Sequence, residues 1–537
     1  MNIKTEGILD VYKDPVETIL KLRNLDTKWL NADESNLYDG HLLRNFNEGK
    51  ELLYKHQNGR VVIIVDQDTD GYTSAATMYL WLQENFPNME LQYVVAEGKT
   101  HGIIFPILPP STEYDLLIIP DASSSEKDKH KKLAAESIDI LILDHHEITE
   151  VDNPYAIVIN PHHPECEYPN KNLSGVGVVY KFIEAVDDDN DVDNHSKYLD
   201  LVATGLVADV MQITNLENKA IVNIGTKQVN NPYLQAYFKA DGRLKNKSFD
   251  ATAIGFYIAP AINALIRMGT VEEKTNLFRA LIGDIDAEYT VAQIISLKGK
   301  QDRGKEPVVT RIVMNLQKEG RDNNKLIFAE TPKNTISTVT GLIAGQLAGM
   351  YKKPVLLGRL HEDGFYSGSA RSINKSSVEN LKDFCEESGL FEFVAGHQAA
   401  FGWKLHKDKV EAFLNYAETN LPPFEQYYSV FQMANDKGAI ITQLEELKEH
   451  YGPGFDDILL YDEFYLNEDM AQLIGAKNNT LRIQTDELTY IGFKYKGEIP
   501  EEGKIIRIVG KPNINYYNGQ SIPQIIITDF ETVDLVL

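Results

Sequence analysis

Residues 61–71 decide the fold, and they read Val61-Val62-Ile63-Ile64-Val65-Asp66-Gln67-Asp68-Thr69-Asp70-Gly71. The β-branched run does not alternate with polar residues, so it predicts a strand buried on both faces, as in a parallel sheet covered by helices. Aspartates at alternate positions follow this strand directly. Such carboxylates can surround one point. The competing interpretation is an acidic turn that caps the next helix through Asp70 or Thr73.

Similar aliphatic runs occupy residues 116–119, 138–143 and 157–159. The first leads to Asp121 and the second ends at Asp144, while residues 73–85 have the composition of a crossover helix. Parallel strands bring their carboxyl ends to one edge of a sheet, where α/β proteins bind ligands. The sequence therefore predicts an α/β fold with acidic side chains gathered at that edge.

Histidines and one further aspartate extend this cluster. His145 and His146 follow Asp144, and Asp209 ends a nearly apolar stretch, where a charge needs a partner or a metal. An isolated His-His pair is more often a surface or core feature, but here it follows a predicted strand. Carboxylates with imidazole suit Mn²⁺ or Mg²⁺, and zinc is less favoured without thiolates. Two such ions about 3.5–4 Å apart can activate water and stabilise a phosphoryl transfer. These residues alone predict a two-metal phosphoesterase.

Composition limits how the chain can bind nucleic acid. The 537 residues include 53 Lys and Arg against 79 Asp and Glu, which gives a net charge of −26. A surface this acidic cannot hold phosphates everywhere, so any nucleic-acid contact must be local and metal-assisted. Cys166 and Cys385 are too few for a disulfide framework. Without a signal peptide or a long apolar run at hand, we expect a soluble cytoplasmic protein that does not bind membranes.

Prolines and glycines along the chain predict four structural regions. Leu421-Pro422-Pro423 is the clearest boundary, because consecutive prolines end a helix. Glycine-punctuated short strands beyond it suggest a small β-barrel. We interpret the acidic residues 184–193 as a solvated loop. The predicted parts are a sheet domain at 1–215, a helical connector at 216–305, a second, smaller α/β domain at 306–420, and the barrel at 425–537.

The ordered motifs resemble those of the DHH phosphoesterase superfamily: Asp-x-Asp-x-Asp-Gly, a strand-end Asp, Asp-His-His and a late Asp. Further segments narrow the resemblance to RecJ-like exonucleases, in which a DHH domain is followed by a DHHA1 domain and an oligonucleotide-binding (OB) barrel. These segments are residues 172–178, 367–372, 396–402, 451–454 and 513–519.

The resemblance implies 5′-to-3′ hydrolysis of single-stranded DNA to 5′-mononucleotides, with two Mn²⁺ or Mg²⁺ ions. By motif position it implies that Asp121 bridges the ions and that Asp66 binds metal or orients water. Asp144 would support the ligating histidine, and His146 would contact the scissile phosphate. The implied metal ligands are Asp68, Asp70, Asp121, His145 and Asp209.

The resemblance also implies DNA contacts outside the metal site. The implied set is Arg267, Ser369, Arg371, Gly396, His397, Lys511, Tyr516 and Tyr517. The forked guanidinium of Arg371 suits phosphate, although a surface salt bridge is the simpler alternative. His397 could equally be structural. The tyrosines could stack on bases or pack inward, and in a strand only one of the two can face a groove. Ala261 departs from the family, which usually has arginine there, and this weakens the predicted grip on a 5′ end.

Other functions remain open from the sequence. One is a phosphodiesterase for short oligonucleotides or cyclic dinucleotides, although its relatives generally end after the second domain. The other is a non-catalytic DNA-binding scaffold, which predicts eroded metal ligands. Single-stranded DNA is the expected substrate, a single-strand-binding protein or a helicase the expected partner, and a monomer the expected state.

Overall fold

The computed structural model describes residues 1–97, 101–245, 247–332, 335, 339–373, 376–378, 380–423, 425–517 and 519–534. The chain forms two compact units, each built from separate segments. The parallel-sheet unit comprises Arg23–Gly299 and Glu446–Asp457. The barrel unit comprises Met1–Leu22, Lys300–Glu445 and Ile458–Leu537, and it contains two sheets. Each unit is described by itself.

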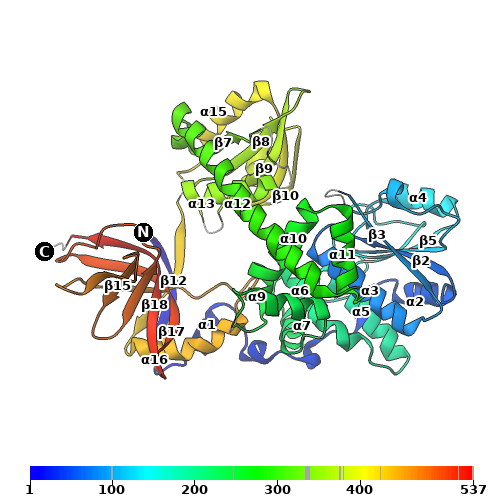
Figure 1. Ribbon diagram of the computed structural model, residues 1–537, viewed down its shortest axis with the longest axis horizontal. Coiled ribbons are helices and arrows are strands. Elements are labelled where there is room, and N and C mark those ends of the chain that lie inside the picture. The colour runs from blue at the N-terminus through cyan, green and yellow to red at the C-terminus, as the bar shows by residue number, and fades with distance from the viewer. Residues whose placement is uncertain are drawn as a thin grey trace. The chain divides into compact units, whose positions relative to one another are not determined.

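A five-stranded parallel sheet forms the centre of the parallel-sheet unit, with the order β3-β2-β4-β5-β6. The aliphatic runs become its inner strands, because side chains that cannot reach water on either face are stable there. The predicted parallel sheet is therefore confirmed, with one edge strand, β3, that the sequence did not reveal. The strands are β2 (Arg60–Val65), β3 (Glu90–Val95), β4 (Leu116–Pro120), β5 (Asp139–Leu143) and β6 (Ile157–Ile159) (Figure 1).

Helices cover this sheet, and α3 (Thr69–Asn85) is the predicted crossover helix. The loop expected at 184–193 is wrong in its first part, because α5 continues to Asp189. Asp187 is fully buried there and accepts a hydrogen bond of 2.8 Å from Trp81 Nε1, so this acidic residue belongs to the core. The remaining helices here are α2 (Phe46–Lys55), α4 (Lys127–Ala135), α5 (Gly175–Asp189) and α6 (Leu199–Ala208).

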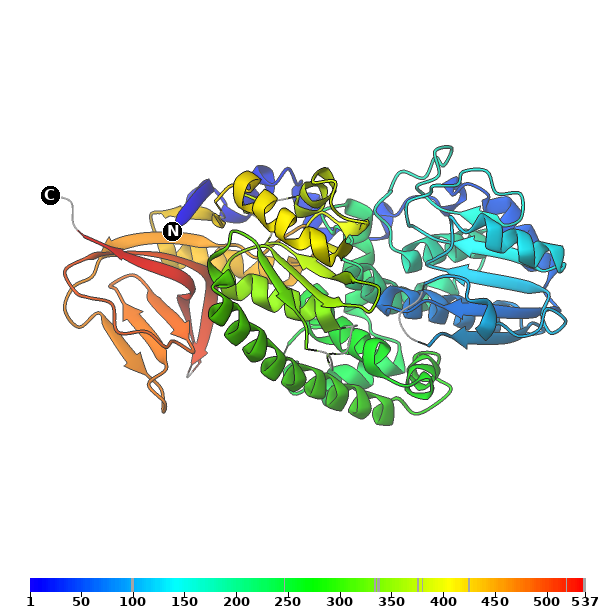
Figure 2. The ribbon, with the colours of Figure 1, turned by 90° about the horizontal axis from the view of Figure 1, so that it is seen from above.

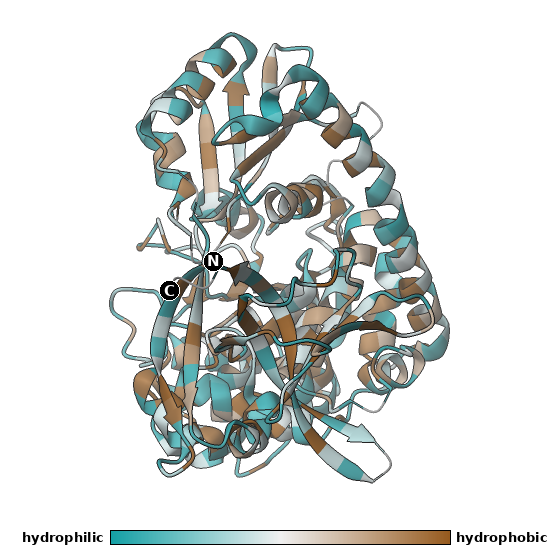
Figure 3. Cartoon of the chain, turned by 90° about the vertical axis from the view of Figure 1, so that its left-hand side faces the viewer, coloured by the Kyte–Doolittle hydropathy of each residue, from teal (hydrophilic) through white to brown (hydrophobic). Residues whose placement is uncertain are grey.

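The predicted helical connector is present but longer than expected. Its last helix, α12 (Ala287–Glu319), passes residue 305 because buried Val309, Ile312 and Leu316 continue one apolar stripe at helical spacing. Hydrophobic and hydrophilic residues alternate along the helices in Figure 3. The others are α7 (Leu216–Lys227), α8 (Pro232–Ala240), α9 (Ala251–Ala253), α10 (Ala259–Met268) and α11 (Val271–Leu281). Within the described chain, Ala251–Met268 is long and apolar enough to cross a membrane, but 56% of it is buried in the protein, as in a core helix.

The barrel unit contains a five-stranded sheet of order β10-β11-β9-β8-β7. One face packs on a core that includes Leu356, Ala370, Phe401 and Trp403. Helix α14 begins at Leu381, because the side chain of Asn380 caps it by accepting a hydrogen bond from Asp383 N–H. The elements are β7 (Ile327–Glu330), α13 (Thr340–Tyr351), β8 (Val355–Leu360), β9 (Phe365–Arg371), α14 (Leu381–Glu387), β10 (Phe393–His397), β11 (Ala400–His406) and α15 (Val410–Asn420).

An eight-stranded sheet forms the rest of this unit, with the order β1-β12-β13-β17-β18-β16-β15-β14. The longest pair, β17 and β18, is red in Figure 2. Helices α1 (Pro15–Leu22) and α16 (Lys437–Gln443) accompany the sheet. Its strands are β1 (Asn2–Asp10), β12 (Tyr427–Ala434), β13 (Leu460–Tyr465), β14 (Ala471–Ile474), β15 (Thr480–Gln484), β16 (Thr489–Phe493), β17 (Ile505–Tyr517) and β18 (Gln520–Val533).

Two segments lie outside the domains that the sequence predicts for them. Residues 1–22 join the barrel unit instead of the 1–215 domain, because β1 pairs in parallel with β12 from Asn2↔Tyr427 to Asp10↔Ala434. Residues 446–457 join the parallel-sheet unit instead of the 425–537 barrel. There Pro453 O accepts a 2.8 Å hydrogen bond from Ile213 N–H, and Gly452 packs against Ile213.

Candidate metal centre and substrate-binding residues

The carboxyl edge of the parallel sheet gathers the predicted ligands. Asp66, Asp121 and Asp144 directly follow β2, β4 and β5, and Asp209 caps the C-terminus of α6. His145 lies among them. Its Nε2 is 3.2 Å from Asp121 Oδ1, 3.4 Å from Asp209 Oδ2 and 4.0 Å from Asp70 Oδ2. The structure therefore brings residues from four separate segments to one point.

Two helix N-termini fix the acidic turn. Asp68 caps α3 and accepts a 3.0 Å bond from Gly71 N–H, so capping does occur, through Asp68 and not through Asp70 or Thr73. Asp70 lies in the first turn of α3 and accepts a 2.6 Å bond from Gly175 N–H at the start of α5. A helix N-terminus favours a negative group, so α5 holds the Asp70 carboxylate in place.

Asp121 occupies the most constrained position. Its φ is +65°, a strained conformation for a residue with a side chain, and the residue is only 2% exposed. Its Oδ1 atom is buried and, although His145 Nε2 lies 3.2 Å away, it accepts no hydrogen bond from the residues that the structure describes. A Cβ atom on Gly175 would lie 2.4 Å from this same oxygen. An orphaned carboxylate oxygen beside other carboxylates fits a ligand of a divalent cation.

Burial and mutual repulsion shape the charges of this cluster. Burial, followed by the charge of Asp68, raises the pKa of Asp70 to about 7. Burial, followed by the charges of Asp70 and Asp68, raises the pKa of Asp209 to about 8. Burial also raises the pKa of Asp121 well above its ordinary value. The carboxylates can all ionise at neutral pH only when a cation compensates them, and oxygen ligands with one imidazole suit Mn²⁺ or Mg²⁺.

Asp144 holds the other histidine, which differs from the expectation that it supports the ligating one. Its Oδ1 is 2.8 Å from Nδ1 of His146, and it accepts bonds from the backbone N–H groups of His145 and His146. This hydrogen bond raises the pKa of His146 to about 9, whereas burial lowers the pKa of His145 to about 4. His145 is therefore a neutral imidazole, as a metal ligand must be, and His146 is a cation with a 60% exposed side chain.

Sequence reasoning missed His101. Its Nδ1 is 2.5 Å from Asp66 Oδ2, and the neighbouring Gly102 N–H donates a 3.0 Å bond to Asp66 Oδ1. Donor atoms of Asp66, Asp68 and His101 lie within 4.8 Å of one another, as metal ligands could. The only local signal is that Gly102 follows His101 and adopts φ +72°, since the spacing to residue 66 carries no pattern.

Arg267 is next to the carboxylates. Together with Asp68, Asp70, Asp209 and Asn263 it lines a cavity of about 180 Å³. Burial lowers the pKa of Arg267 and the charge of Asp68 opposes this shift, so the guanidinium stays charged at the cavity wall. Ala261, on the same helix α10, is fully buried. The position at which the family usually has arginine therefore cannot reach the cavity here.

The predicted residues of the second domain share one region of its sheet. Ser369 and Arg371 lie on β9, and Gly396 and His397 lie on β10. Ala400 of β11 pairs with Arg371 on one side and with His397 on the other. A Cβ atom on Gly341, near the start of α13, would lie 2.6 Å from Arg371 Nη2, so the helix approaches the guanidinium closely.

In the barrel both predicted tyrosines are exposed, Tyr516 by 70% and Tyr517 by 64%. The inward-packing alternative is wrong, because the ends of β17 and β18 pair only with each other there and neither face is covered. Lys511 is exposed on β17. Two other cations at the start of β17 already have partners: Arg507 pairs with Glu463 and Glu531, and Lys504 with Glu501 and Asp534.

Comparison with known proteins agrees with this arrangement. Residues 60–206 match the family model "DHH family, N-terminal domain", and residues 433–529 match the "RecJ OB domain". The chain resembles the putative SPbeta prophage-derived single-strand DNA-specific exonuclease YorK of Bacillus subtilis, with 31% identity over 99% of this chain and 98% of that protein. It is 25% identical to the single-stranded-DNA-specific exonuclease RecJ of B. subtilis, over 96% of this chain and 67% of that protein.

The fold also matches a solved structure. RecJ from Thermus thermophilus in complex with Mn²⁺ has a TM-score of 0.79 and 19% identity, over 100% of this chain and 80% of that one. The carboxyl-edge cluster, the second α/β domain and the barrel define a phosphoesterase of the DHH class. Within that class, the chain belongs to the RecJ-like family of single-strand DNA-specific exonucleases.

Proposed function

We propose that this chain hydrolyses single-stranded DNA from its 5′ end and releases 5′-mononucleotides, with two Mn²⁺ or Mg²⁺ ions. The observation that carries the proposal is the carboxylate cluster around His145, in which Asp121 Oδ1 is buried without a hydrogen bond. The names of the relatives support DNA as the substrate. The direction of digestion follows from the family resemblance.

The donor set could hold two ions. Asp70, His145 and Asp209 present donor atoms within 4.8 Å of one another, and Asp66, Asp68 and His101 form a second such group. A third group, Asp121, His145 and His146, overlaps the first at His145. Asp121 would be shared by the two ions, as the family resemblance implies, and its Oδ1 lies 3.2 Å from Nε2 of His145 in the first group. When bound, the ions supply an activated water and stabilise the entering and leaving oxygens of the phosphodiester.

Protein groups near the cluster bind and orient the substrate. His146 is protonated at neutral pH because Asp144 accepts its Nδ1 proton, so its exposed edge can donate to a non-bridging phosphate oxygen. Arg267, on the wall of the same cavity, offers a second cation to the DNA backbone. Ser369 and Arg371 on β9 would hold a phosphate on the second domain. Gly396 and His397 lie on β10, which is separated from β9 by β11.

The barrel would hold the strand beyond the cleft. Exposed Tyr516 and Tyr517 can stack on unpaired bases of the DNA, and exposed Lys511 can contact the phosphates of the DNA backbone. We further propose that the protein acts in the cytoplasm as a monomer, with a single-strand-binding protein or a helicase as partner. Two buried free cysteines are consistent with a reducing compartment.

The test is digestion of one single strand labelled either at its 5′ or at its 3′ end, with Mn²⁺. A 5′-to-3′ exonuclease releases the 5′ label at once as a mononucleotide, while the 3′-labelled strand shortens gradually. Immediate loss of the 3′ label would reverse the polarity. Cleavage confined to dinucleotides would favour the short-oligonucleotide phosphodiesterase. Binding without cleavage, equal to that of Asp121→Ala, would favour the scaffold.

A further inference from the structure

The five-stranded sheet of the barrel unit carries side chains in rows across one face. Directly paired residues of neighbouring strands point to the same side, so the register defines the rows. The first two rows contain the predicted phosphate-binding residues, and the third contains none of the predicted residues. The rows are Val355, Arg371, Ala400 and His397; Leu357, Ser369, Gly402 and Ala395; and Arg359, Ser367, Lys404 and Phe393.

The third row remains open to solvent. The opposite face of the sheet is closed, because Ala370, Phe401 and Trp403 pack into the core there. On the row-bearing face, α13 reaches Arg371 and Ser369 through Gly341. Next to Arg371 lies a hollow of about 350 Å³, which Ser369 borders. Its lining includes all four residues of the third row.

The chemistry of this row suits a nucleotide. Phe393 is 54% exposed, which is unusual for a large aromatic side chain. Arg359 donates to the carbonyl of Thr335, and Lys404 Nζ lies 3.4 Å from Asp363 on the surface. An exposed ring beside two cations can stack on a base while the cations contact its phosphates.

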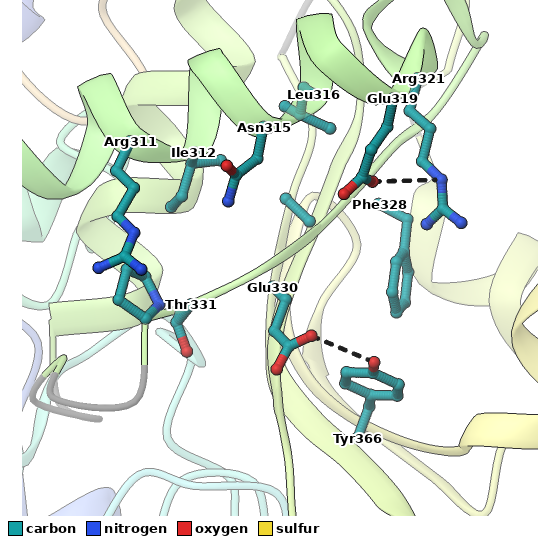
Figure 4. Close-up of a pocket in the computed structure, with 12 residues that line it drawn as sticks. Arg311, Ile312, Asn315, Leu316, Glu319, Arg321, Phe328, Glu330, Thr331 and Tyr366 are labelled. Carbon is teal, nitrogen blue, oxygen red and sulfur yellow. Dashed lines mark hydrogen bonds and ion pairs between the residues drawn. The ribbon is translucent and has the colours of Figure 1, made fainter.

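In a neighbouring hollow of the same unit, several lining side chains pair with one another. It measures about 480 Å³ and lies between α12 and β7 (Figure 4). There Arg321 is 3.6 Å from Glu319, and Tyr366 Oη donates to Glu330 at 3.3 Å. One of its cations and one of its aromatic rings are thus already partnered, and its other ring, Phe328, is only 4% exposed, so it offers less of a platform for a base than Phe393 does.

We propose that Phe393, Arg359 and Lys404 form a separate nucleotide subsite, which binds single-stranded DNA downstream of the phosphate at Arg371. The proposal rests on the proposed function. The first and third rows are four residues apart along β9, from Arg371 to Ser367, or about 13 Å. That separation corresponds to about two nucleotide steps of an extended strand. The DNA would therefore run along β9 from Arg371 towards Ser367. Only strands longer than a dinucleotide would reach the subsite.

The experiment compares Phe393→Ala with Met350→Ala, whose residue is 55% exposed in the same unit. Anisotropy of labelled dT2, dT4 and dT8 without divalent metal measures binding, since hydrolysis cannot interfere. Loss of one stacked base should weaken dT8 and dT4 binding by about 5- to 150-fold. Binding of dT2 should not change. A second variant, Lys404→Gln, with exposed Lys409→Gln as its control, should lower the salt dependence of dT8 binding by about 0.7 in log–log slope.

Equal dT8 affinity for Phe393→Ala and Met350→Ala would overturn the subsite, and so would an equal loss at every length. The salt slope of Lys404→Gln tests the subsite independently where Phe393→Ala fails to fold, and a slope equal to that of Lys409→Gln would overturn it. Hydrolysis of dT8 by the unaltered protein in Mn²⁺ is measured separately. Its absence would overturn the proposed function, and the binding series would still decide the subsite.

Discussion

The carboxyl edge of the parallel sheet and the open face of the second sheet differ in the burial and the sign of their charges. The edge forces Asp70, Asp121 and Asp209 together in the interior, where burial raises the pKa of each. The face spreads Arg371, Arg359 and other polar groups over solvent-accessible strands. Buried carboxylates that repel one another favour the binding of cations, which suits metal-dependent chemistry. The half-buried Arg371 and Arg359 can instead interact with phosphate at a smaller desolvation cost. The carboxyl edge would therefore catalyse hydrolysis, and the open face would bind the DNA.

The largest effect is expected for Asp121→Ala at the carboxyl edge. Removal of the bridging carboxylate should lower the rate of hydrolysis by about 1,000-fold or more, because several kcal/mol of charge stabilisation disappear with the ions. Single-strand binding in the absence of metal should not change. Initial rates with labelled DNA and Mn²⁺ measure the loss, and exposed Asp128→Ala on α4 is the control. Near-normal turnover in folded Asp121→Ala would refute the two-metal assignment.

Metal removal should separate the two regions thermodynamically. Mn²⁺ at 100 times its dissociation constant should stabilise the wild-type protein by about 2.7 kcal/mol, since it binds the folded state and relieves the carboxylate repulsion. EDTA should reverse this gain. Calorimetric scans with and without Mn²⁺ measure it. The same gain in Asp121→Ala would mean that the stabilising ion binds elsewhere.

Gly175→Ala tests how tightly the edge is built. An added methyl group would lie 2.4 Å from Asp121 Oδ1, so the carboxylate or α5 must move. A displacement of this kind should reduce kcat by about 100-fold while DNA binding is retained. Gly242→Ala is the control, because its added Cβ meets nothing within 4 Å. Equal kcat values for the two variants would show that the edge tolerates such a shift.

On the open face, Arg371→Ala should raise KM by about 10-fold, as expected for one lost charge-assisted bond of about 1.5 kcal/mol. Manganese uptake, followed by titration calorimetry, should remain unchanged, because Arg371 holds phosphate in the proposal and not metal. Exposed Arg311→Ala on α12 in the same unit is the control. Loss of metal binding in folded Arg371→Ala would mean that Arg371 contributes to the metal site and does not only hold phosphate.

The smallest effects are expected at the barrel. Tyr516→Ala and Tyr517→Ala should each weaken binding of long strands by about 5-fold, the lower limit for one stacked base. Tyr12→Ala is the control, since that side chain is 84% exposed. If only one of the pair responds, its side of the β17–β18 hairpin is the DNA-binding side. Point variants are sharper than a deletion of 425–537, which would also remove 446–457 from the parallel-sheet unit.

The sequence predicted what depends on local pattern. Aliphatic runs ending in aspartate marked β2, β4 and β5, because burial on both faces leaves a continuous apolar signature. It missed the contact of His101 with Asp66, which depends on how a loop folds back over the sheet. It also misjudged residues 184–189, where one buried partner, Trp81, makes an acidic helix end part of the core. Tertiary partners decide such cases, and no spacing rule encodes them.

The pairing of β1 with β12 has a consequence for how the chain is made. Tyr427 is synthesised more than four hundred residues after its partner Asn2, about 20 to 85 s later at ordinary elongation rates. During that interval the first strand has an unpaired edge, and the parallel-sheet unit still lacks its segment Glu446–Asp457. The barrel edge therefore closes after most of the chain has been translated, and a slow, aggregation-prone phase of biogenesis is expected at this seam.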